Sequence, residues 1–221
     1  MNQNFGNQQL LLEQQKQLEN AQKYDGIIWD YVQNPPRKIR TNFNITVTKN
    51  KEILYLKDGF IMRRDQVKET SDKLEILTNL EQIKHLKWIG DYGKNSQKFQ
   101  KWMATWKGEV LQNVGGVYNE NGIKVGLWKE IILNNWSKAQ VYEEGRYENR
   151  LRQGTWKYIY QDQEIGGGEY NFQGLKNGKW MDLGEDFWQL SQETYRGEFK
   201  NGNRVGKWVI RVQEAILGLL K

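Results

Sequence analysis

The chain contains no cysteine, a single histidine and only two prolines among its 221 residues. Without cysteine it can form neither a disulfide framework nor a thiol-based catalytic site. His85 has no second imidazole or thiol to complete a zinc site or a common catalytic triad, so we expect a structural or surface role for it. No segment approaches the roughly 18 apolar residues of a membrane-spanning helix. These absences predict a protein that holds no metal and no cofactor.

The N-terminal residues are rich in glutamine and lack the basic, apolar and small-residue order of a signal peptide, so we expect a cytoplasmic protein. Hydrophobic residues make up 38% of the chain and aromatic residues 13%, which is enough for a folded core. The net charge of +6 is unevenly placed: residues 1–35 carry −2, residues 36–115 carry +7 and residues 116–221 carry +1. A basic middle segment fits an acidic protein, a lipid surface or nucleic acid, whereas the nearly neutral C-terminal half disfavours nucleic acid.

A short sequence motif of glycines and aromatic residues, here called a phrase, occurs five times after residue 89. In each copy an aromatic residue stands two positions after a glycine, and in four of the five copies a tryptophan follows two positions after a second glycine. The copies centre on Trp102, Trp128, Trp156, Trp180 and Trp208. Residues 116–167 laid over residues 168–219 without a gap share 16 identities, where composition alone would give roughly three. The true period is therefore a super-repeat of 52 residues with two unlike halves.

We expect the glycines and aromatic residues of these phrases to hold the repeats together. Residues two apart in a strand share a face, so within each phrase the first glycine and its aromatic residue face the same way. Glycine inside a strand weakens it by about 0.5–1 kcal/mol, so its recurrence needs a compensating reason. A flat ring over the bare backbone supplies one, and we expect such stacking to join successive hairpins. The residues concerned are Gly90, Trp102, Gly116, Tyr118, Gly126, Trp128, Gly145, Tyr147, Gly154, Trp156, Gly168, Tyr170, Gly178, Trp180, Gly197, Phe199, Gly206 and Trp208.

The last copy, residues 195–208, has Asn201-Gly202 as a favoured hairpin turn. This copy resembles a membrane occupation and recognition nexus (MORN) repeat, and the array from about residue 73 to residue 217 is similar to the more variable Gly-Tyr-Gly-Lys-Gly-Trp repeat proteins. The tryptophans lie 26, 28, 24 and 28 residues apart, which is longer than the family's usual spacing, and the first copy has Gln100 in place of the second glycine. The resemblance implies an elongated antiparallel meander that acts as a scaffold or tether at cytoskeletal, ciliary or cortical membrane structures, and it implies no enzymatic activity.

Upstream of the array, leucines at residues 8–23 predict a short helix that stops near Asp25-Gly26 and packs on its own domain or docks on a partner. Pro35-Pro36 then breaks the chain. Alternating apolar residues and turn signals at 42–62 predict strands, which we interpret as a degenerate opening of the same sheet. The predicted domains are an N-terminal helix and linker (1–36), a basic β opening (37–72) and a MORN-like array with a C-terminal cap (73–221).

The predicted fold is mainly β, an elongated antiparallel β-meander that forms a single-sheet, solenoid-like repeat array with a short N-terminal helix. Glu75, Glu130 and Asp182 each stand 15 residues before a phrase glycine, so they would lie at one height along this sheet. They either form a distinct acidic row or pair with lysines on the solvated face. The glycine-rich stretches at 166–168 and 174–179 do not predict a phosphate loop, because strands rather than a helix follow them.

Two sets of residues are candidate contacts for a partner. Trp136 and Trp188 lie one super-repeat apart and outside the phrase; if they are exposed with Trp106, the three make an aromatic stripe suited to a helix or an extended peptide, and otherwise they are core residues. The basic residues either contact anionic lipid or an acidic partner or belong to a solvated face. They are Arg37, Arg40, Arg63 and Arg64.

The sequence therefore predicts a non-catalytic interaction scaffold that binds a protein partner along the face or edge of its sheet, in a cytoskeletal or ciliary assembly. The alternative is a peripheral membrane-binding module that uses the basic segment 37–115 on anionic lipid. An enzyme and a nucleic-acid-binding protein are less favoured, and no small-molecule substrate is expected.

Overall fold

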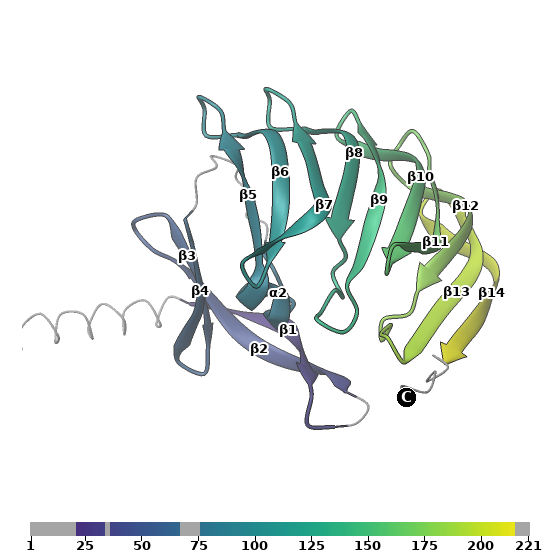
Figure 1. Ribbon diagram of the computed structural model, residues 1–221, viewed down its shortest axis with the longest axis horizontal. Coiled ribbons are helices and arrows are strands. Elements are labelled where there is room, and N and C mark those ends of the chain that lie inside the picture. Colours follow the sequence, from purple (N-terminus) through teal and green to yellow (C-terminus); the bar gives the residue numbers. More distant parts are fainter. Residues whose placement is uncertain (1–20, 34–35, 67–75, 215–221) are drawn as a thin grey trace, which may run out of the picture. The chain divides into compact units, whose positions relative to one another are not determined.

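The computed structural model describes residues 21–33, 36–66 and 76–214. Within these ranges the chain is a succession of antiparallel strands with one short helix, so the predicted mainly-β class is confirmed. The chain divides into two compact units between His85 and Leu86. Each unit has its own open sheet, one of four strands and one of ten (Figure 1).

The first unit is a four-stranded sheet in which the strands follow one another in chain order. Its last turn, Asp58-Gly59, has positive φ at both residues, 51° and 83°, as a two-residue hairpin turn requires. The strands predicted within residues 42–62 are therefore present, together with one strand before them. The elements are β1 (Gln22–Asp30), β2 (Arg37–Val47), β3 (Glu52–Lys57), β4 (Phe60–Gln66) and α2 (Leu80–His85).

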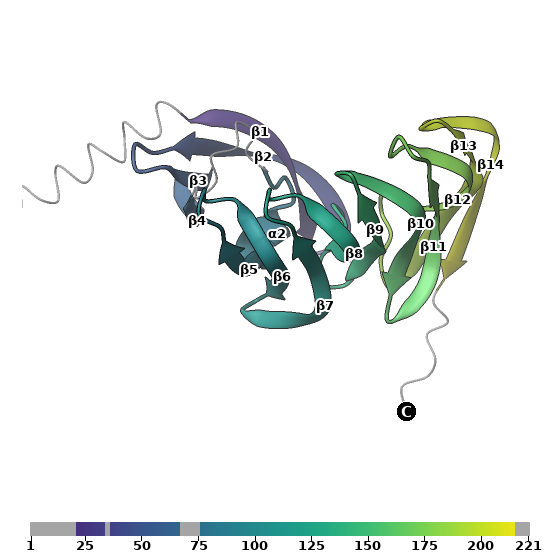
Figure 2. The same cartoon turned by 90° about the horizontal axis from the view of Figure 1, so that it is seen from above.

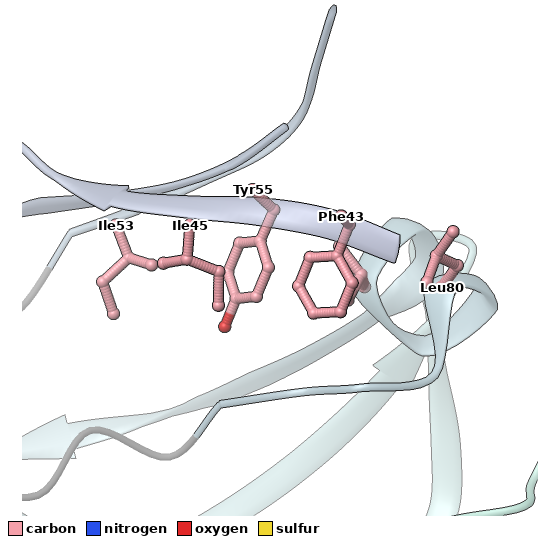
Figure 3. Close-up of a cluster of buried hydrophobic side chains, with 6 residues drawn as sticks. Phe43, Ile45, Ile53, Tyr55 and Leu80 are labelled. Carbon is pink, nitrogen blue, oxygen red and sulfur yellow. The ribbon is translucent and has the colours of Figure 1, made fainter. Parts of the chain in front are cut away.

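One face of this sheet carries a buried apolar core that α2 helps to close. Alternate residues of β2 and β3 point to the same face, and Figure 3 shows their side chains in a line that ends at Leu80 of the helix. The side-chain oxygen of Asn79 accepts hydrogen bonds from backbone N–H groups in the first turn of α2, which caps the helix. The core consists of Phe43, Ile45, Ile53, Tyr55, Leu80 and Ile83.

The prediction of a single continuous sheet is wrong. Residues 42–62 do not open the repeat array, because β2, β3 and β4 pair with one another through short turns and bury their apolar face within the first unit. The predicted start of the array at residue 73 lies outside the described residues. Ile76 and Leu77, which follow it, pack against the core of the first unit.

The helix predicted for residues 8–23 lies mostly outside the described residues, and its last part is a strand instead. Gln22 and Lys23 belong to β1, and so does the predicted helix stop at Asp25-Gly26. Gly26 is needed in this strand for close packing, since a Cβ atom there would lie 2.7 Å from a Leu80 side-chain atom and 2.9 Å from the Phe43 ring. The glycine that suggested a helix end therefore marks a tight contact within the sheet.

The second unit is a meander in which each strand pairs with its neighbours in the chain. Figures 1 and 2 show the strands following one another in sequence order from β5 to β14. The meander predicted from the repeats is thus confirmed for this unit. The strands are β5 (Leu86–Tyr92), β6 (Lys98–Trp106), β7 (Glu109–Tyr118), β8 (Lys124–Ile131), β9 (Val141–Glu148), β10 (Leu151–Tyr160), β11 (Gln163–Tyr170), β12 (Lys176–Leu183), β13 (Ser191–Lys200) and β14 (Asn203–Glu214).

The tryptophan of every phrase lies flat on the first glycine of the same phrase. A Cβ atom added to any of these five glycines would stand 2.2–2.5 Å from the nearest indole ring atoms, so no larger residue fits. The predicted stacking of rings on glycine is confirmed, but each contact joins the two strands of one hairpin rather than two successive hairpins. The pairs are Gly90–Trp102, Gly116–Trp128, Gly145–Trp156, Gly168–Trp180 and Gly197–Trp208.

The second glycine of each phrase has a different role. Gly126, Gly154, Gly178 and Gly206 have φ between 64° and 75°, and a Cβ atom on them would meet nothing within 4 Å. They are needed for their left-handed backbone conformation, which accompanies a bulge in the strand. Gln100, which replaces this glycine in the first copy, has φ of 57° and therefore adopts the same conformation at a steric cost.

The two glycine roles predict different costs for the same substitution. Gly145→Ala should destabilise the protein by about 3 kcal/mol or more, because the new methyl group displaces the Trp156 ring. Gly154→Ala should cost only about 1–2 kcal/mol, because it adds backbone strain without a clash. Urea denaturation followed by tryptophan fluorescence measures both. Equal losses in the two variants would contradict the ring-on-glycine contact.

Gln100→Gly should stabilise the protein by about 1 kcal/mol, since glycine adopts the left-handed conformation without strain. The matched control is Lys101→Gly, the next residue in the strand, whose φ is not positive; it should lose about 0.5–1 kcal/mol. Thermal and urea unfolding of the two variants give the comparison. A loss of stability in both would show that residue 100 gains nothing from glycine.

Candidate interaction surface

The phrase tryptophans and their aromatic neighbours form a continuous row of ten rings on one face of the ten-stranded sheet, here called the ring face. Successive rings meet edge to face, with centroids 4.9–5.3 Å apart within a phrase and 5.8–6.2 Å apart between phrases. Such contacts contribute beyond the area they bury. In order, the ring row is Tyr92, Trp102, Tyr118, Trp128, Tyr147, Trp156, Tyr170, Trp180, Phe199 and Trp208.

A row of cations covers the rings. Each phrase has a lysine or arginine four residues before its tryptophan, and this even separation puts both side chains on the same face of the strand. The charged groups lie 4.2–5.3 Å from the centroid of that tryptophan, and the first four also lie over the aromatic residue of the next phrase. Sequence reasoning missed this role, although the spacing is visible in every copy. The cations are Lys98, Lys124, Arg152, Lys176 and Arg204.

Two buried carboxylates pair with these cations. Glu130 lies 2.5 Å from Lys124 Nζ and 2.7 Å from Arg152 Nη2, and it accepts a hydrogen bond from the Tyr147 hydroxyl at 3.0 Å. The predicted pairing of the periodic acids with basic residues is therefore confirmed for Glu130, but on the buried ring face rather than the solvated one. Glu75 lies outside the described residues.

Asp182 repeats this arrangement one super-repeat later. Its carboxylate lies 2.5 Å from Lys176 Nζ and 3.4 Å from Arg204 Nη2, and the Tyr158 hydroxyl is 3.3 Å from one of its oxygens. Each acid thus joins a cation of its own strand to one two strands further on. The networks link neighbouring hairpins where the ring-on-glycine contacts do not.

The pKa values in the first network fit a structural ion pair. Burial alone would raise the pKa of Glu130, but the charges and hydrogen bonds of Lys124 and Arg152 outweigh it and lower the pKa below the ordinary value of 4.5. Burial, followed by the charge of Glu130, raises the pKa of Tyr147 to about 12. At neutral pH the carboxylate is therefore ionised and the phenol is a neutral donor. Lys124, Arg152 and Tyr147 all bind the Glu130 carboxylate, which suits a role in stabilising the sheet rather than in proton transfer to a substrate.

The three tryptophans considered as a partner contact do not form an exposed stripe. Trp136, Trp188 and Trp106 have exposed fractions of 0%, 7% and 6%. Trp136 and Trp188 lie in the loops that follow β8 and β12, and their ring centroids are 6.3 Å apart. The exposure on which the aromatic-stripe hypothesis depended is absent, because the two loops, one super-repeat apart, bury these indoles.

The four arginines considered as a basic contact do not share one face of the first sheet. Arg37 and Arg40 are exposed but three residues apart in β2, and Arg63 and Arg64 are adjacent in β4, so each pair points to opposite faces. Arg63 is engaged within the unit, with Nε 2.6 Å from Asp65 and Nη1 donating to backbone carbonyls of α2. Arg64 lies 3.2 Å from a carboxylate of β3. The four therefore do not make one basic patch.

The opposite side of the ten-stranded sheet, here called the open face, exposes apolar side chains. Ile89, Val117, Leu127 and Val209 follow or precede ring-face residues and so point away from the rings. Their exposed fractions are 51%, 44%, 72% and 58%. A registered row crosses all ten strands on this face through Ile89, Met103, Gly115, Lys129, Glu144, Lys157, Gly167, Met181, Arg196 and Val209.

Bare glycine backbone interrupts this row once in each super-repeat. A Cβ atom on Gly115 or Gly167 would lie 1.9 Å or 2.1 Å from a carbonyl oxygen of the preceding strand. An open hollow of about 850 Å³ lies over Gly167, with Thr155, Met181 and Arg211 in its lining. A second hollow of about 360 Å³ is lined by Lys129, Lys138, Tyr142 and several glutamine residues. Among the residues that the structure describes, no group of three or more potential ligands is placed to hold a metal ion.

The comparisons with known proteins leave this surface to be interpreted from its own chemistry. A scan against protein-family models found no match, and a search of curated proteins found no similar sequence. In the described part of the chain, every helix is too short or too polar to cross a membrane. The resemblance to MORN repeats therefore stays a prediction.

Replacing the buried carboxylate tests the ion network. Glu130→Gln should destabilise the protein by about 1–3 kcal/mol, because Lys124 and Arg152 lose a shared counter-ion at a buried position. Glu164→Gln is the matched control: Glu164 pairs with Lys157 at 2.7 Å but is about half exposed, so its loss should cost less than about 0.5 kcal/mol.

The effect of Glu130→Gln should also depend on pH. Because the pKa of Glu130 is lower in the folded protein, its contribution is present above the ordinary value of 4.5 and is lost as the pH falls toward the folded value. Urea unfolding at neutral pH and in steps below pH 4.5 should show that the difference in the free energy of unfolding between wild type and variant becomes smaller as the pH falls. A gap that stays constant would mean that the charge of Glu130 is not what stabilises the fold.

Proposed function

We propose that this protein is a non-catalytic interaction scaffold, built from MORN-like β-hairpin repeats, which binds a protein partner along the open face of its ten-stranded sheet. The observation that carries the proposal is the asymmetry of the two faces. On the ring face, the aromatic residues, cations and acids contact one another within the chain. The open face presents apolar side chains that are 44–72% exposed, including Leu127 and Val117. These exposed residues flank a registered row of mixed apolar, charged and glycine positions that crosses all ten strands, and an exposed apolar surface bordered by polar groups suits an interface.

The chemistry of this row favours a polypeptide over a polyanion. Its centre has Lys129 and Lys157 on either side of Glu144, so cations and an acid alternate. Its ends are apolar, with Ile89 beside Met103 at one edge of the sheet and Val209 at the other. A nucleic acid or an anionic surface would instead be matched by a row of cations with no acid among them. A partner segment of mixed charge with apolar residues at its ends fits this pattern.

Repetition suits the proposed scaffold role. The bare backbone at Gly115 and Gly167 recurs after 52 residues, so the same local surface is presented twice along the sheet. A solenoid-like array of this kind offers an extended surface rather than an enclosed pocket. The two hollows are open, and neither encloses a substrate; the larger one mixes apolar side chains and bare glycine backbone with polar groups, which supports binding rather than catalysis. The cytoskeletal or ciliary setting comes from the MORN resemblance alone.

Charge substitution on the open face tests the proposal. Leu127→Glu should weaken partner capture at least tenfold, because a carboxylate then occupies the most exposed apolar position of the face. The matched control is Phe172→Glu, which changes a 78% exposed residue in the turn between β11 and β12. Proximity labelling in the native cell, with candidates then measured by calorimetry on purified protein, gives the readout. Equal binding by both variants would exclude the open face.

The membrane alternative has a separate measurement. The basic middle segment would bring the protein to anionic vesicles but not to neutral ones. Flotation with both vesicle types, on wild type and on an Arg37→Glu, Arg40→Glu double variant, distinguishes the two functions. Flotation with anionic vesicles alone, lost in the double variant, would favour the membrane module and count against the scaffold.

A further inference from the structure

The ring row ends at β14, which is the last strand of the ten-stranded sheet. Trp208 meets Phe199 on one side at 5.1 Å, and within residues 86–214 no ring follows it on the other side. Among the described residues, β14 pairs only with β13, so one edge of its backbone has no strand partner. The first four phrase tryptophans each donate their indole N–H to a backbone carbonyl at 3.0–3.3 Å. Trp208 makes no such bond in the described part of the chain.

The outer part of β14 is unusually apolar for an edge strand. Ile210 and Val212 lie on the ring face and are 58% and 56% exposed, and Val209 on the open face is 58% exposed. Between residues 209 and 212 only Arg211 carries a charge. Natural proteins usually protect an edge with short strands, several charges or proline. This strand is twelve residues long, and its exposed end is apolar on both faces.

We propose that β14 pairs antiparallel with β14 of a second copy of this chain, which continues the sheet across a two-fold axis at Ile210. In this register Ile210 stands opposite its own copy, Trp208 opposite Val212, and Val209 opposite Arg211. The apolar residues of the ring face then meet one another, and the apolar row at the end of the array is covered. The proposal goes beyond the scaffold function and does not depend on it.

The register follows from the side-chain pattern. A two-fold axis perpendicular to the sheet puts the ring faces of both copies on the same side. Residues that stand opposite each other must then belong to the same face, so the axis runs between the two copies of one residue. An axis at Val209 would bring Lys207 opposite Arg211, and an axis at Arg211 would bring that arginine opposite itself; both put like charges together. An axis at Val212 would place Ile210 opposite Glu214. Of these four axes, only the one at Ile210 matches apolar with apolar along the ring face and opposes no like charges.

A second copy fits this edge because β14 is complementary to itself. In the register given above, apolar residues of one copy face apolar residues of the other, and no charged residue faces a like charge. A two-fold interface requires such self-complementarity, because both copies contribute the same surface. The area covered by one strand pair is at the low end for stable interfaces, so the dimer should be weak. An unrelated extended segment added to this edge would leave the mass of the purified protein that of a monomer.

The full chain should show concentration-dependent dimerisation by sedimentation equilibrium between about 1 and 200 µM, a range that spans the weak interfaces. Ile210→Lys should raise the dissociation constant at least tenfold, because two lysines then face each other across the axis. Ile210→Glu should do the same. An equimolar mixture of the two variants should dimerise again, since lysine then faces glutamate. A mixture that stays monomeric would overturn the register.

Ile89→Lys is the matched control. Ile89 is 51% exposed in β5, the strand at the other edge of the same sheet, and receives the same substitution. It should leave the dissociation constant within about twofold of wild type, as surface changes away from an interface do. A chain that remains monomeric at every concentration would overturn the proposal. So would dimerisation that Ile89→Lys abolishes and Ile210→Lys leaves intact.

A covalent readout is available because the chain has no cysteine of its own. Under mild oxidation, Ile210→Cys should form a disulfide-linked dimer, since opposite residues of an antiparallel pair lie within disulfide range. Ile89→Cys under the same conditions should remain mostly monomeric. Equal cross-linking of the two variants would show random collision rather than a two-fold strand pair. The circular dichroism spectrum of each variant should match that of wild type, which separates loss of pairing from loss of folding.

Discussion

The flat contact between an indole ring and a glycine backbone is the interaction on which the second unit depends. Each tryptophan lies so close to its glycine that even a methyl group would not fit, and this distance sets how the two strands of a hairpin face each other. The row of edge-to-face rings follows from it, because flat indoles leave their edges directed at the neighbouring aromatic residues. The cations follow in turn, because the exposed π-surface of each ring attracts the charged group four residues earlier.

The same interaction divides the sheet into two chemically different faces. On the ring face, Glu130 and Asp182 neutralise cations held over the rings, so aromatic, basic and acidic groups complete one another within the chain. A single sheet layer can bury large indoles in this way because long basic side chains cover them with their methylene stems. What remains for other molecules is the open face and the outer edge of β14. The proposed partner contact and the proposed self-pairing use these two surfaces separately.

Local features of the second unit were predictable from the sequence, and contacts between distant segments were not. The hairpin at Asn201-Gly202 follows from turn chemistry, and both residues have positive φ as expected. The contact of Trp156 with Gly145 follows from their recurrence in every phrase. Burial of Trp136 against Trp188 could not be predicted, because it joins two loops 52 residues apart whose conformation no local pattern specifies. The cation row was visible as a spacing of four residues, but its contact with the rings was not, because it also depends on the irregular register in which four residues of one strand span two of its neighbour.

The sequence by itself determined the strand class, the hairpins, the 52-residue period and the stacking of rings on glycine, because each depends on residues that are close in the chain or on the alternation of side chains along a strand. Tertiary structure decided that residues 22–66 form a sheet of their own, that Gly26 admits Leu80 and Phe43 instead of ending a helix, and that the periodic acids are buried. These outcomes depend on which apolar faces meet across long stretches of chain. An alternating pattern states that a strand has an apolar face, but it does not state what covers that face.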